Sequence, residues 1–415
     1  MQKGKAWIKF AAYMDQITGA AYLAMFLVQA GYRFLVTTEF PVDELAVLEG
    51  GTAAHLFISL FLTEPQWILL VIVFLRYAFS REYDWKRYAA ALIAGICAFI
   101  IYFRNGEASI LVYVLLVLGA KEIPFRKMIQ MYFCLCVSIL IVTVAASQLG
   151  LVDNHVWDVT YRNIRIAFGF DYPTDFASHI LFLCFCWWYL RGKKLTYAEA
   201  LLTAGLGVFV YVFCEARFST AMLLLLGGVM GYCRFKEKKN AGYRPHPVCV
   251  GLLEAVPVLC AVFIHVISIL YDSGNRFLSW LDNLLSQRLA LAKRAIDIYG
   301  FNLWGSDIPM IGNGSKSAAP EKYFYIDSSY LQFSLLYGVV FLGLVLILFW
   351  LAGEKIRKKQ EWILMWILAL AAVHGLFEQH LLELAFFPFL LLIFADLGGK
   401  KRKQKEAEET DGKEK

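Results

Sequence analysis

Apolar runs of about twenty residues recur along the whole chain, and they limit its possible folds more than any other feature. A helix of that length spans the roughly 30 Å hydrocarbon core of a bilayer, whereas a soluble helix of equal length needs a polar face. Charged residues make up only 18% of the 415 residues, below the roughly 25% typical of soluble domains. We therefore expect an all-α, polytopic integral membrane protein.

About twelve transmembrane helices are expected from these runs. They are residues 15–36, 54–79, 88–103, 108–120, 128–149, 174–190, 198–214, 218–233, 248–271, 329–352, 362–378 and 381–397. Thr63-Glu64-Pro65 interrupts the second run, so a kink or break is expected there. Residues 1–397 then form one transmembrane domain, and the Lys- and Glu-rich tail, 398–415, is expected to be disordered.

Basic residues concentrate in alternate connections and at both termini. Cytoplasmic loops carry an excess of Lys and Arg, so this side is expected to be cytoplasmic and the long loops 150–173 and 272–328 to lie outside. Of the 29 basic residues on the cytoplasmic side 20 are Lys, whereas 8 of the 11 on the outer side are Arg. Because guanidinium groups bind phosphate in a bidentate fashion, this bias suggests that an anion is held outside; snorkelling and salt bridges within loops are the alternative.

The first outer loop carries two arginines just before an expected helix. Arg162 and Arg165 are three residues apart, so a helical turn would place both on one face. Asp175 or Thr174 could cap the helix that follows, and His179 lies about a turn inside it. An ionisable residue within a membrane helix is a functional candidate, although a neutral imidazole hydrogen-bonded between helices is an equal alternative for His179.

A short outer turn carries Glu215 and Arg217, which either pair with each other or add Arg217 to the arginine cluster. The second long loop has apolar residues at helical spacing from Leu278 to Ile296, which predicts an amphipathic helix on the outer membrane surface. Arg288 and Arg294 flank its apolar stripe. Arg276 lies near its start, and residues 312–319, rich in Gly, Ser and Ala, are expected to form a mobile flap.

The end of the second long loop and a later short turn supply further candidates. Asp327 is expected at the N-terminus of the next helix, where it is either a cap or a functional acid, and Tyr330 follows one turn later. His374 and Glu378 are four residues apart, so one helical face would hold them as a histidine–carboxylate pair. No further ligand accompanies them, so no metal is expected. P-loop, GxGxxG, GxSxG, HExxH and CxxC signatures do not occur in the sequence.

Three stretches together resemble the Wzy-type bacterial polysaccharide polymerases, which are grouped with the O-antigen ligases. They are Arg162–Asp175 (RNIRIAFGFDYPTD), Ser286–Gly305 (SQRLALAKRAIDIYGFNLWG) and Asp327–Gly338 (DSSYLQFSLLYG), with HGLFEQHLLELAFFPFLLL similar to the family's closing helices. The family's His-Pro-Asn is Tyr172-Pro173-Thr174 here, so only Pro173 carries over. The topological resemblance covers the whole chain.

The resemblance implies an enzyme at the outer face of the bacterial plasma membrane that polymerises oligosaccharide repeat units carried on polyprenyl pyrophosphate. The pyrophosphate gains negative charge as it leaves, so a clamp of Arg162, Arg165 and Arg288, helped by Arg217, would stabilise it. Asp327, Glu378, His179 and His374 are the candidates for the base that activates the acceptor hydroxyl. Secondary candidates are Arg276, Arg294, Glu215 and Tyr330.

No cofactor and no nucleic-acid partner is expected, and a flippase and a chain-length regulator are the partner proteins that the family would imply. Two alternatives stay open. A lipid-linked oligosaccharide flippase or exporter would suit the same number of helices, but its charges should gather near the midplane rather than in outer loops. An O-antigen-type ligase would use the same outer face.

Overall fold

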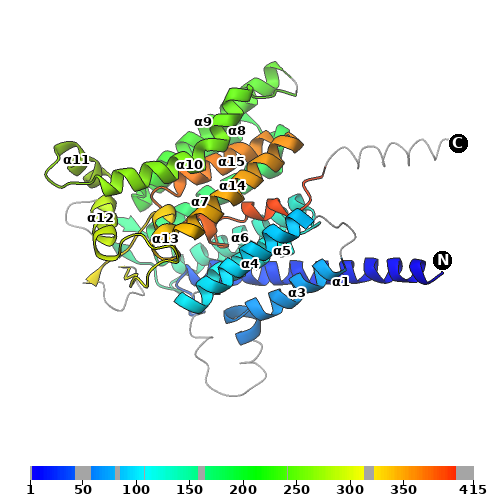
Figure 1. The fold of residues 1–415 in the computed structure, drawn as a ribbon. Helices are drawn as coiled ribbons and strands as arrows, with labels where there is room; N and C mark the ends of the chain where they lie inside the picture. The colour runs from blue at the N-terminus through cyan, green and yellow to red at the C-terminus, as the bar shows by residue number, and fades with distance from the viewer. Residues whose placement is uncertain are drawn as a thin grey trace.

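The computed structural model describes residues 2–42, 58–79, 85–106, 108–157, 164–240, 242–312 and 322–398, and nearly all regular structure in these ranges is helical (Figure 1). The α-helices are α1 (Gln2–Val36), α3 (Gln66–Ala78), α4 (Trp85–Asn105), α5 (Ala108–Gly119), α6 (Phe125–Gln148), α7 (Pro173–Arg191), α8 (Tyr197–Cys214), α9 (Arg217–Lys239), α10 (Pro247–Ile269), α11 (Arg276–Leu284), α12 (Arg288–Tyr299), α13 (Ser329–Leu335), α14 (Val339–Lys359) and α15 (Trp362–His374). Short elements are the π-helix η2 (Ser59–Thr63), the 3-10 helices η3 (Gly192–Lys194), η5 (His380–Leu382) and η6 (Phe389–Ile393), and the antiparallel strands β1 (Val156–Trp157) and β2 (Arg165–Ile166).

Six of the described helices are long and apolar enough to cross a membrane: α1 from Phe10 onward, α6, α8, α9, α10 and α14. Shorter apolar helices, among them α3, α5 and α15, lie between them. The side chains of α8 and α10 that face away from the bundle are large and apolar, for example Leu201 and Val262. Such a surface suits lipid contact, so the chain has the build of a multi-pass membrane protein.

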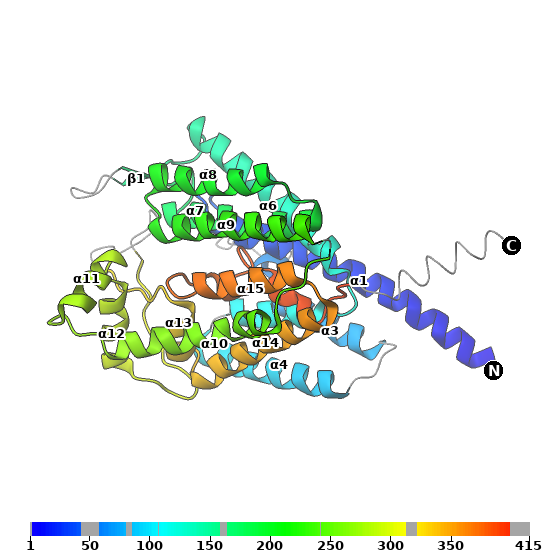
Figure 2. The same cartoon turned by 90° about the horizontal axis from the view of Figure 1, so that it is seen from above.

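The bundle has two chemically different ends. α11 and α12 lie at one end, which we call the loop end, and the N-terminal part of α1 lies at the other (Figure 1). Basic residues occupy the last turns of α9 and α14, at the end opposite α11 and α12, which we call the basic end. Seen from above, α15 lies between a layer containing α6 to α9 and a layer containing α4, α10 and α14 (Figure 2).

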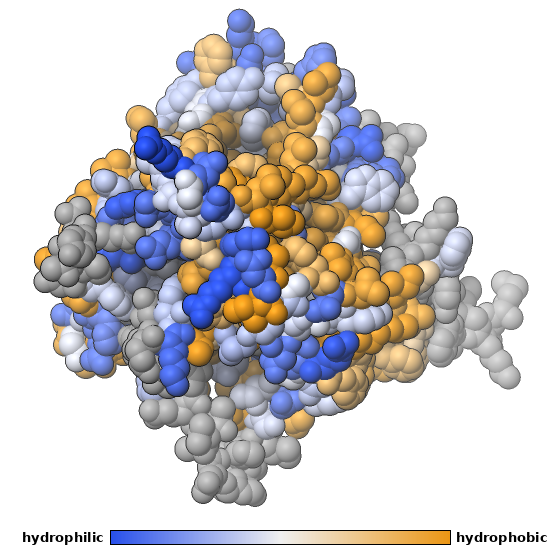
Figure 3. All heavy atoms as spheres, turned by 60° about the vertical axis from the view of Figure 1, so that its left-hand side comes forward, coloured by the Kyte–Doolittle hydropathy of each residue, from blue (hydrophilic) through white to orange (hydrophobic). Residues whose placement is uncertain are grey.

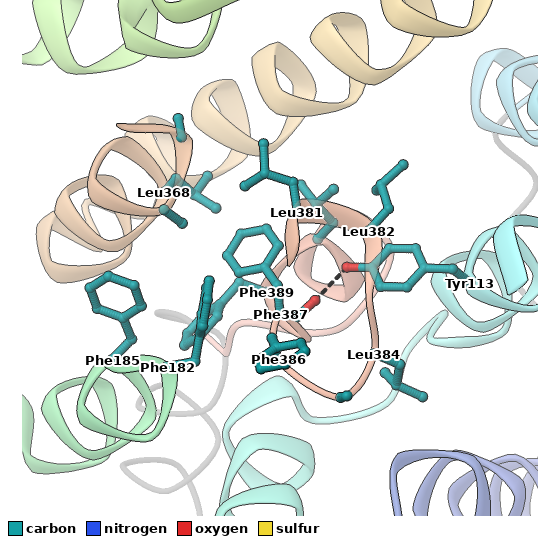
Figure 4. Packing of buried hydrophobic residues seen from close by; sticks show 14 of the residues in the cluster. Tyr113, Phe182, Phe185, Leu368, Leu381, Leu382, Leu384, Phe386, Phe387 and Phe389 are labelled. Atoms are coloured by element: carbon teal, nitrogen blue, oxygen red, sulfur yellow. Dashed lines mark hydrogen bonds between the residues drawn. The ribbon is translucent and has the colours of Figure 1, made fainter. Parts of the chain in front are cut away.

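The prediction of a last transmembrane helix over residues 381–397 is wrong. This segment forms the two 3-10 turns η5 and η6 with irregular chain between them, and its side chains, including Leu381, Phe386 and Phe389, are buried in the middle of the bundle (Figure 4). Pro388 lies directly before η6 and has no N–H to continue a helix. Hydropathy alone cannot distinguish this buried irregular segment from a lipid-facing helix, because both are apolar.

Side chains from neighbouring helices satisfy the backbone of this irregular segment. Tyr113 of α5 donates its hydroxyl hydrogen to the carbonyl of Phe387 at 2.5 Å. Tyr132 of α6 donates to the carbonyl of Ala385 at 2.7 Å, and the Lys355 ammonium of α14 donates to that of Ala395 at 2.5 Å. Non-helical backbone at membrane depth is tolerated only where protein groups replace the missing intrahelical bonds, as they do here.

Two further expected helices are each divided in two. The expected span 329–352 breaks between α13 and α14 at Gly338, which has φ +100° and packs so closely that a Cβ there would lie 2.2 Å from the carbonyl oxygen of Leu303. The expected helix over 278–296 breaks between α11 and α12, where Ser286 and Gln287 adopt left-handed φ values of 60° and 65°. The expected break near Thr63–Pro65 is confirmed, since η2 ends at Thr63 and α3 starts after Pro65.

The orientation in the membrane stays a prediction, and thiol labelling of a cysteine-free background tests it. Leu303→Cys, at an exposed position of the loop end, should react with a membrane-impermeant maleimide in intact cells. Lys238→Cys, at the basic end, should react only after permeabilisation, because basic ends face the cytoplasm. The reverse pattern would place the loop end inside and contradict the expected topology.

Candidate functional site

A cavity of about 770 Å³ opens at the loop end and gathers residues from five separate parts of the chain. Its charged lining residues are Arg165, Asp175, Glu215, Arg217, Arg288, Asp327 and Glu378. Its other polar and aromatic lining residues include Tyr172, Thr174, Asn283, Ser286, Gln287, Tyr323, Tyr325 and Gln379. Seen with the loop end forward, hydrophilic and hydrophobic surfaces meet on this end of the molecule (Figure 3). The volume falls in the range of about 300–1,000 Å³ that is typical of ligand sites.

Arg288, the first residue of α12, is the centre of the strongest charge cluster in this cavity. Its Nε lies 3.4 Å from Oδ2 of Asp327, and its Nη1 lies 3.0 Å from Oε1 of Glu378. Nη1 also donates to the carbonyl oxygen of Phe377. The side chain is 18% exposed, and within the described chain its Nη2 makes no hydrogen bond. Nη2 can therefore donate to a ligand in the cavity.

The ion pairs change the proton affinity of the groups that take part. Burial raises the pKa of Asp327 to about 6, with the nearby Arg288 charge opposing this effect and the charge of Glu378 adding to it. Burial alone would lower the pKa of Arg288, but the charges of Asp327 and Glu378 raise it above its ordinary value. Arg288 thus stays charged at every physiological pH, whereas Asp327 begins to take up a proton in mildly acidic conditions.

Asp282, in the last turn of α11, holds Arg288 in place through the backbone of α12. Its Oδ1 accepts hydrogen bonds from the N–H groups of Leu289 at 2.8 Å and Ala290 at 3.2 Å. Its Oδ2 accepts the hydroxyl hydrogen of Tyr271 at 3.0 Å. The start of α12 has unpaired N–H groups and a partial positive charge, so a buried carboxylate there supplies what a capping residue normally supplies. Asp282 therefore sets the direction in which α12 presents Arg288.

The turn between α8 and α9 contributes the second arginine. Glu215 ends α8 in a left-handed conformation, φ 47°, and its Oε1 accepts a hydrogen bond from Nη2 of Arg217 at 2.6 Å. Of the two expected alternatives, mutual pairing is therefore the one observed, and both side chains still line the cavity. Arg217 is 43% exposed on its side chain, so its remaining donors face solvent.

The third arginine, Arg165, lies in β2 and not in the helical turn expected from its spacing to Arg162. Its Nε donates to the carbonyl oxygen of Cys214, 3.1 Å away, which places the guanidinium against the end of α8 and on the cavity wall. Arg162 lies outside the described residues. Three of the four arginines of the expected clamp therefore meet in one cavity.

The candidate histidines are not among the cavity's lining residues. His179 is 1% exposed, accepts or donates a hydrogen bond at 2.9 Å with Thr37 Oγ1 and stacks on Phe34 and Phe386. These contacts match the alternative of an imidazole bound between helices. His374 is fully buried, and neither ring nitrogen has a hydrogen-bond partner among the described residues.

The expected pairing of His374 with Glu378 on one helical face does not form. α15 ends at His374, and although the Glu378 N–H still donates to the His374 carbonyl at 3.2 Å, the Glu378 carboxylate pairs with Arg288 instead. The spacing places the two residues on one turn, but it cannot predict that Arg288, from a distant segment, binds the carboxylate.

The secondary candidates divide between the cavity and other parts of the loop end. Glu215 lines the cavity. Arg276 is exposed at the start of α11, and Arg294 lies over the ring of Phe324 at 5.5 Å from its centroid. Tyr330 is fully buried and donates to the carbonyl of Ala372 at 2.8 Å, which is a contact between helices. No group of His, Cys, Asp and Glu residues that could hold a metal ion occurs in the described ranges.

The cavity also contains residues that the sequence did not mark as functional. The sequence predicts only a capping role for Asp175, yet this residue lines the cavity from the first turn of α7. Tyr172, Tyr323 and Tyr325 line it as well, and each combines an apolar ring face with a hydroxyl. One signal was present, because two of these tyrosines lie within four residues of Asp327 in the sequence.

The role assigned to Asp282 predicts a stability effect. Asp282→Ala should lower the free energy of unfolding by about 1–3 kcal/mol, because the buried N–H of Leu289, the half-buried N–H of Ala290 and the Tyr271 hydroxyl lose their acceptor. Asp297→Ala on α12 is the matched control: its ion pair with Lys293 is 56% exposed at the carboxylate, so its loss should cost less than about 0.5 kcal/mol. Thermal unfolding in detergent measures both, and equal melting temperatures for the two variants would contradict the role of Asp282.

No protein-family model, curated protein or solved structure matches this chain.

Proposed function

We propose that the protein is a membrane glycosyltransferase that polymerises polyprenyl-pyrophosphate-linked oligosaccharide repeat units into a surface polysaccharide. The observation that carries this proposal is the meeting of Arg165, Arg217 and Arg288 in one cavity at the loop end. In this proposal the loop end faces the outside of a bacterial plasma membrane, and lipid-linked substrate reaches the cavity from the outer leaflet. Flippase and chain-length regulator proteins are the partners that it would imply.

The chemistry of the proposed transfer calls for directed cationic donors. When the glycosidic bond to the pyrophosphate breaks, the leaving group gains negative charge, and donors already oriented towards it lower the barrier. Arg288 is held by Asp327 and Glu378 and keeps Nη2 available, while Arg217 is half exposed beside Glu215. These carboxylates hold the arginines in a fixed orientation before the substrate binds. Such preorganisation matters because an arginine that must reorient during the reaction loses much of its catalytic effect.

The remaining lining supports a sugar as the second part of the ligand. Tyr172, Tyr323 and Tyr325 supply ring faces and hydroxyl groups, and the side-chain amides of Asn283 and Gln287 supply both donors and acceptors. A saccharide needs many hydrogen bonds of both kinds together with flat apolar surface. An isolated phosphate would need only cations and N–H donors.

The interior of the bundle supports an enzyme over a transporter. Below the cavity, buried side chains such as Phe182, Leu381 and Phe386 fill the centre (Figure 4). A transporter is expected to hold its charged site near the midplane between discontinuous helices. Here the paired charges of the cavity lie at the loop end, where a reaction can proceed without moving substrate through the protein.

The arginine fork is tested by a conservative substitution. Arg288→Lys should lower the initial rate of chain extension by about 100-fold or more, because the compact ammonium of lysine lacks the planar fork that directs separate donors at Asp327, Glu378 and pyrophosphate. Arg294→Lys is the matched control on the same helix, since Arg294 contacts Phe324 and does not line the cavity. The assay is polymer formation at equal amounts of folded protein; equal rates for the two variants would remove Arg288 from the clamp.

Enzyme and transporter are separated by an assay without a sealed membrane. Purified protein in detergent, supplied with lipid-pyrophosphate repeat units, should make a ladder of longer chains with a chelator present and without nucleotide. Detergent removes the two compartments that transport requires, so only a transferase can form product there. Transfer of preformed polymer to a different acceptor without any ladder would identify a ligase, and the absence of both products from folded protein would favour a flippase.

A further inference from the structure

The proposed transfer releases a proton, and the cavity must hold a group to accept it. As the acceptor hydroxyl oxygen bonds to the anomeric carbon of the donor sugar, the bond from that carbon to the phosphate oxygen breaks. The electron pair of the broken bond stays on the pyrophosphate, and the hydroxyl proton passes to a base. A carboxylate that is fixed in an ion pair with an arginine is a poor choice of base, because protonating it would break the pair that orients the arginine.

Three of the four carboxylates that line the cavity are paired with arginine. Glu215 lies 2.6 Å from Arg217, and Asp327 and Glu378 lie 3.4 and 3.0 Å from Arg288. These carboxylates orient the arginines, as described above. Protonating any of these carboxylates would weaken the ion pair that orients its arginine.

Asp175 is the fourth carboxylate and differs from the others. Its side chain forms no hydrogen bond or ion pair with any residue in the described ranges, although it is half-buried and lines the cavity. It lies in the first turn of α7, directly after Pro173 and Thr174, so its backbone is part of a rigid element. A carboxylate kept unpaired at a cavity wall has both oxygens available to a ligand.

The surroundings of Asp175 also differ from those of the arginine cluster. The charged groups that act on it most strongly are His380 and Glu383, followed by Asp171 from its own side and Glu378. His380 is 1% exposed, and its Nδ1 is bound to Glu383 Oε2 at 3.0 Å. Tyr325, in the segment that precedes α13, lies near Glu383 and Asp175 as well. Asp175 thus lies near one imidazole and three carboxylates, and no arginine of the cavity pairs with it in the described chain.

We propose that Asp175 is the general base of the transfer and takes the proton of the acceptor sugar hydroxyl. This inference rests on the proposed function and adds a residue that the motifs did not assign. The arginine pairs hold the pyrophosphate while the carboxylate of Asp175 becomes a neutral acid and later returns the proton to water. Proton acceptance and charge stabilisation are then carried by different walls of one cavity.

The test uses the full-length protein in detergent and lipid-pyrophosphate repeat units as the substrate. Asp175→Asn should lower kcat about 100-fold or more, because an amide keeps the shape but cannot accept the proton. The KM for repeat units and the dissociation constant for the lipid-pyrophosphate donor should each stay within about threefold, since binding does not need the base. Asp307→Asn, an exposed acid at the loop end that does not line the cavity, should match the wild type.

A second variant and a rescue separate the base from a structural role. Asp175→Ser should show the same loss of kcat, and added formate should restore part of its rate by replacing the missing carboxylate; the serine variant decides the matter by itself if the asparagine variant does not fold. The assignment of Asp175 as the general base would be overturned if the variants formed polymer within tenfold of the wild-type kcat, or if the loss were confined to KM or to donor binding. A wild type that makes no product would overturn the proposed function itself, which is a different result from an active wild type with active variants.

Discussion

The geometry of the loop end depends on one buried guanidinium. Arg288 of α12 contacts Asp327, which precedes α13, and Glu378, which follows α15, so one side chain joins three segments distant in sequence. Breaking a buried ion pair by removing one partner costs about 3–5 kcal/mol, because the remaining charge has no compensation. The same contacts that hold these segments together also direct the donors of Arg288, so stability and the proposed chemistry share one set of interactions.

The cavity has three arginines and four carboxylates in its lining, so its formal charge does not favour an anion. Under the proposed function, affinity for pyrophosphate would come from oriented donors and not from a general positive field. This distribution gives the carboxylates two different tasks. Asp327, Glu378 and Glu215 fix arginines, whereas Asp175 pairs with no arginine in the described chain, which is why we propose it as the base.

The irregular segment after α15 supplies the link between the membrane core and the cavity. Glu378 and Gln379 line the cavity at its start, and Leu381 to Ile393 fill the centre of the bundle below it. Tyr113 and Tyr132 donate to carbonyls of this segment, so its chain can remain non-helical inside an apolar environment. A rigid, fully packed support of this kind keeps the carboxylate of Glu378 fixed against Arg288.

The amino-acid sequence alone is enough to predict the class of protein, the approximate position of most helices and the break at Pro65, and it contains the arginine bias of the loops that supply Arg165, Arg217 and Arg288. These features depend on hydropathy, charge and proline, which act locally and can be read along one chain. Contacts between distant segments were needed to show that 381–397 is not a helix, that His374 and Glu378 do not pair, that His179 packs between aromatic rings and that Asp175 lines the cavity without an arginine partner. Each of these depends on where distant segments meet, because an apolar run can face lipid or protein, and because a carboxylate has the same sequence signature whether or not an arginine reaches it.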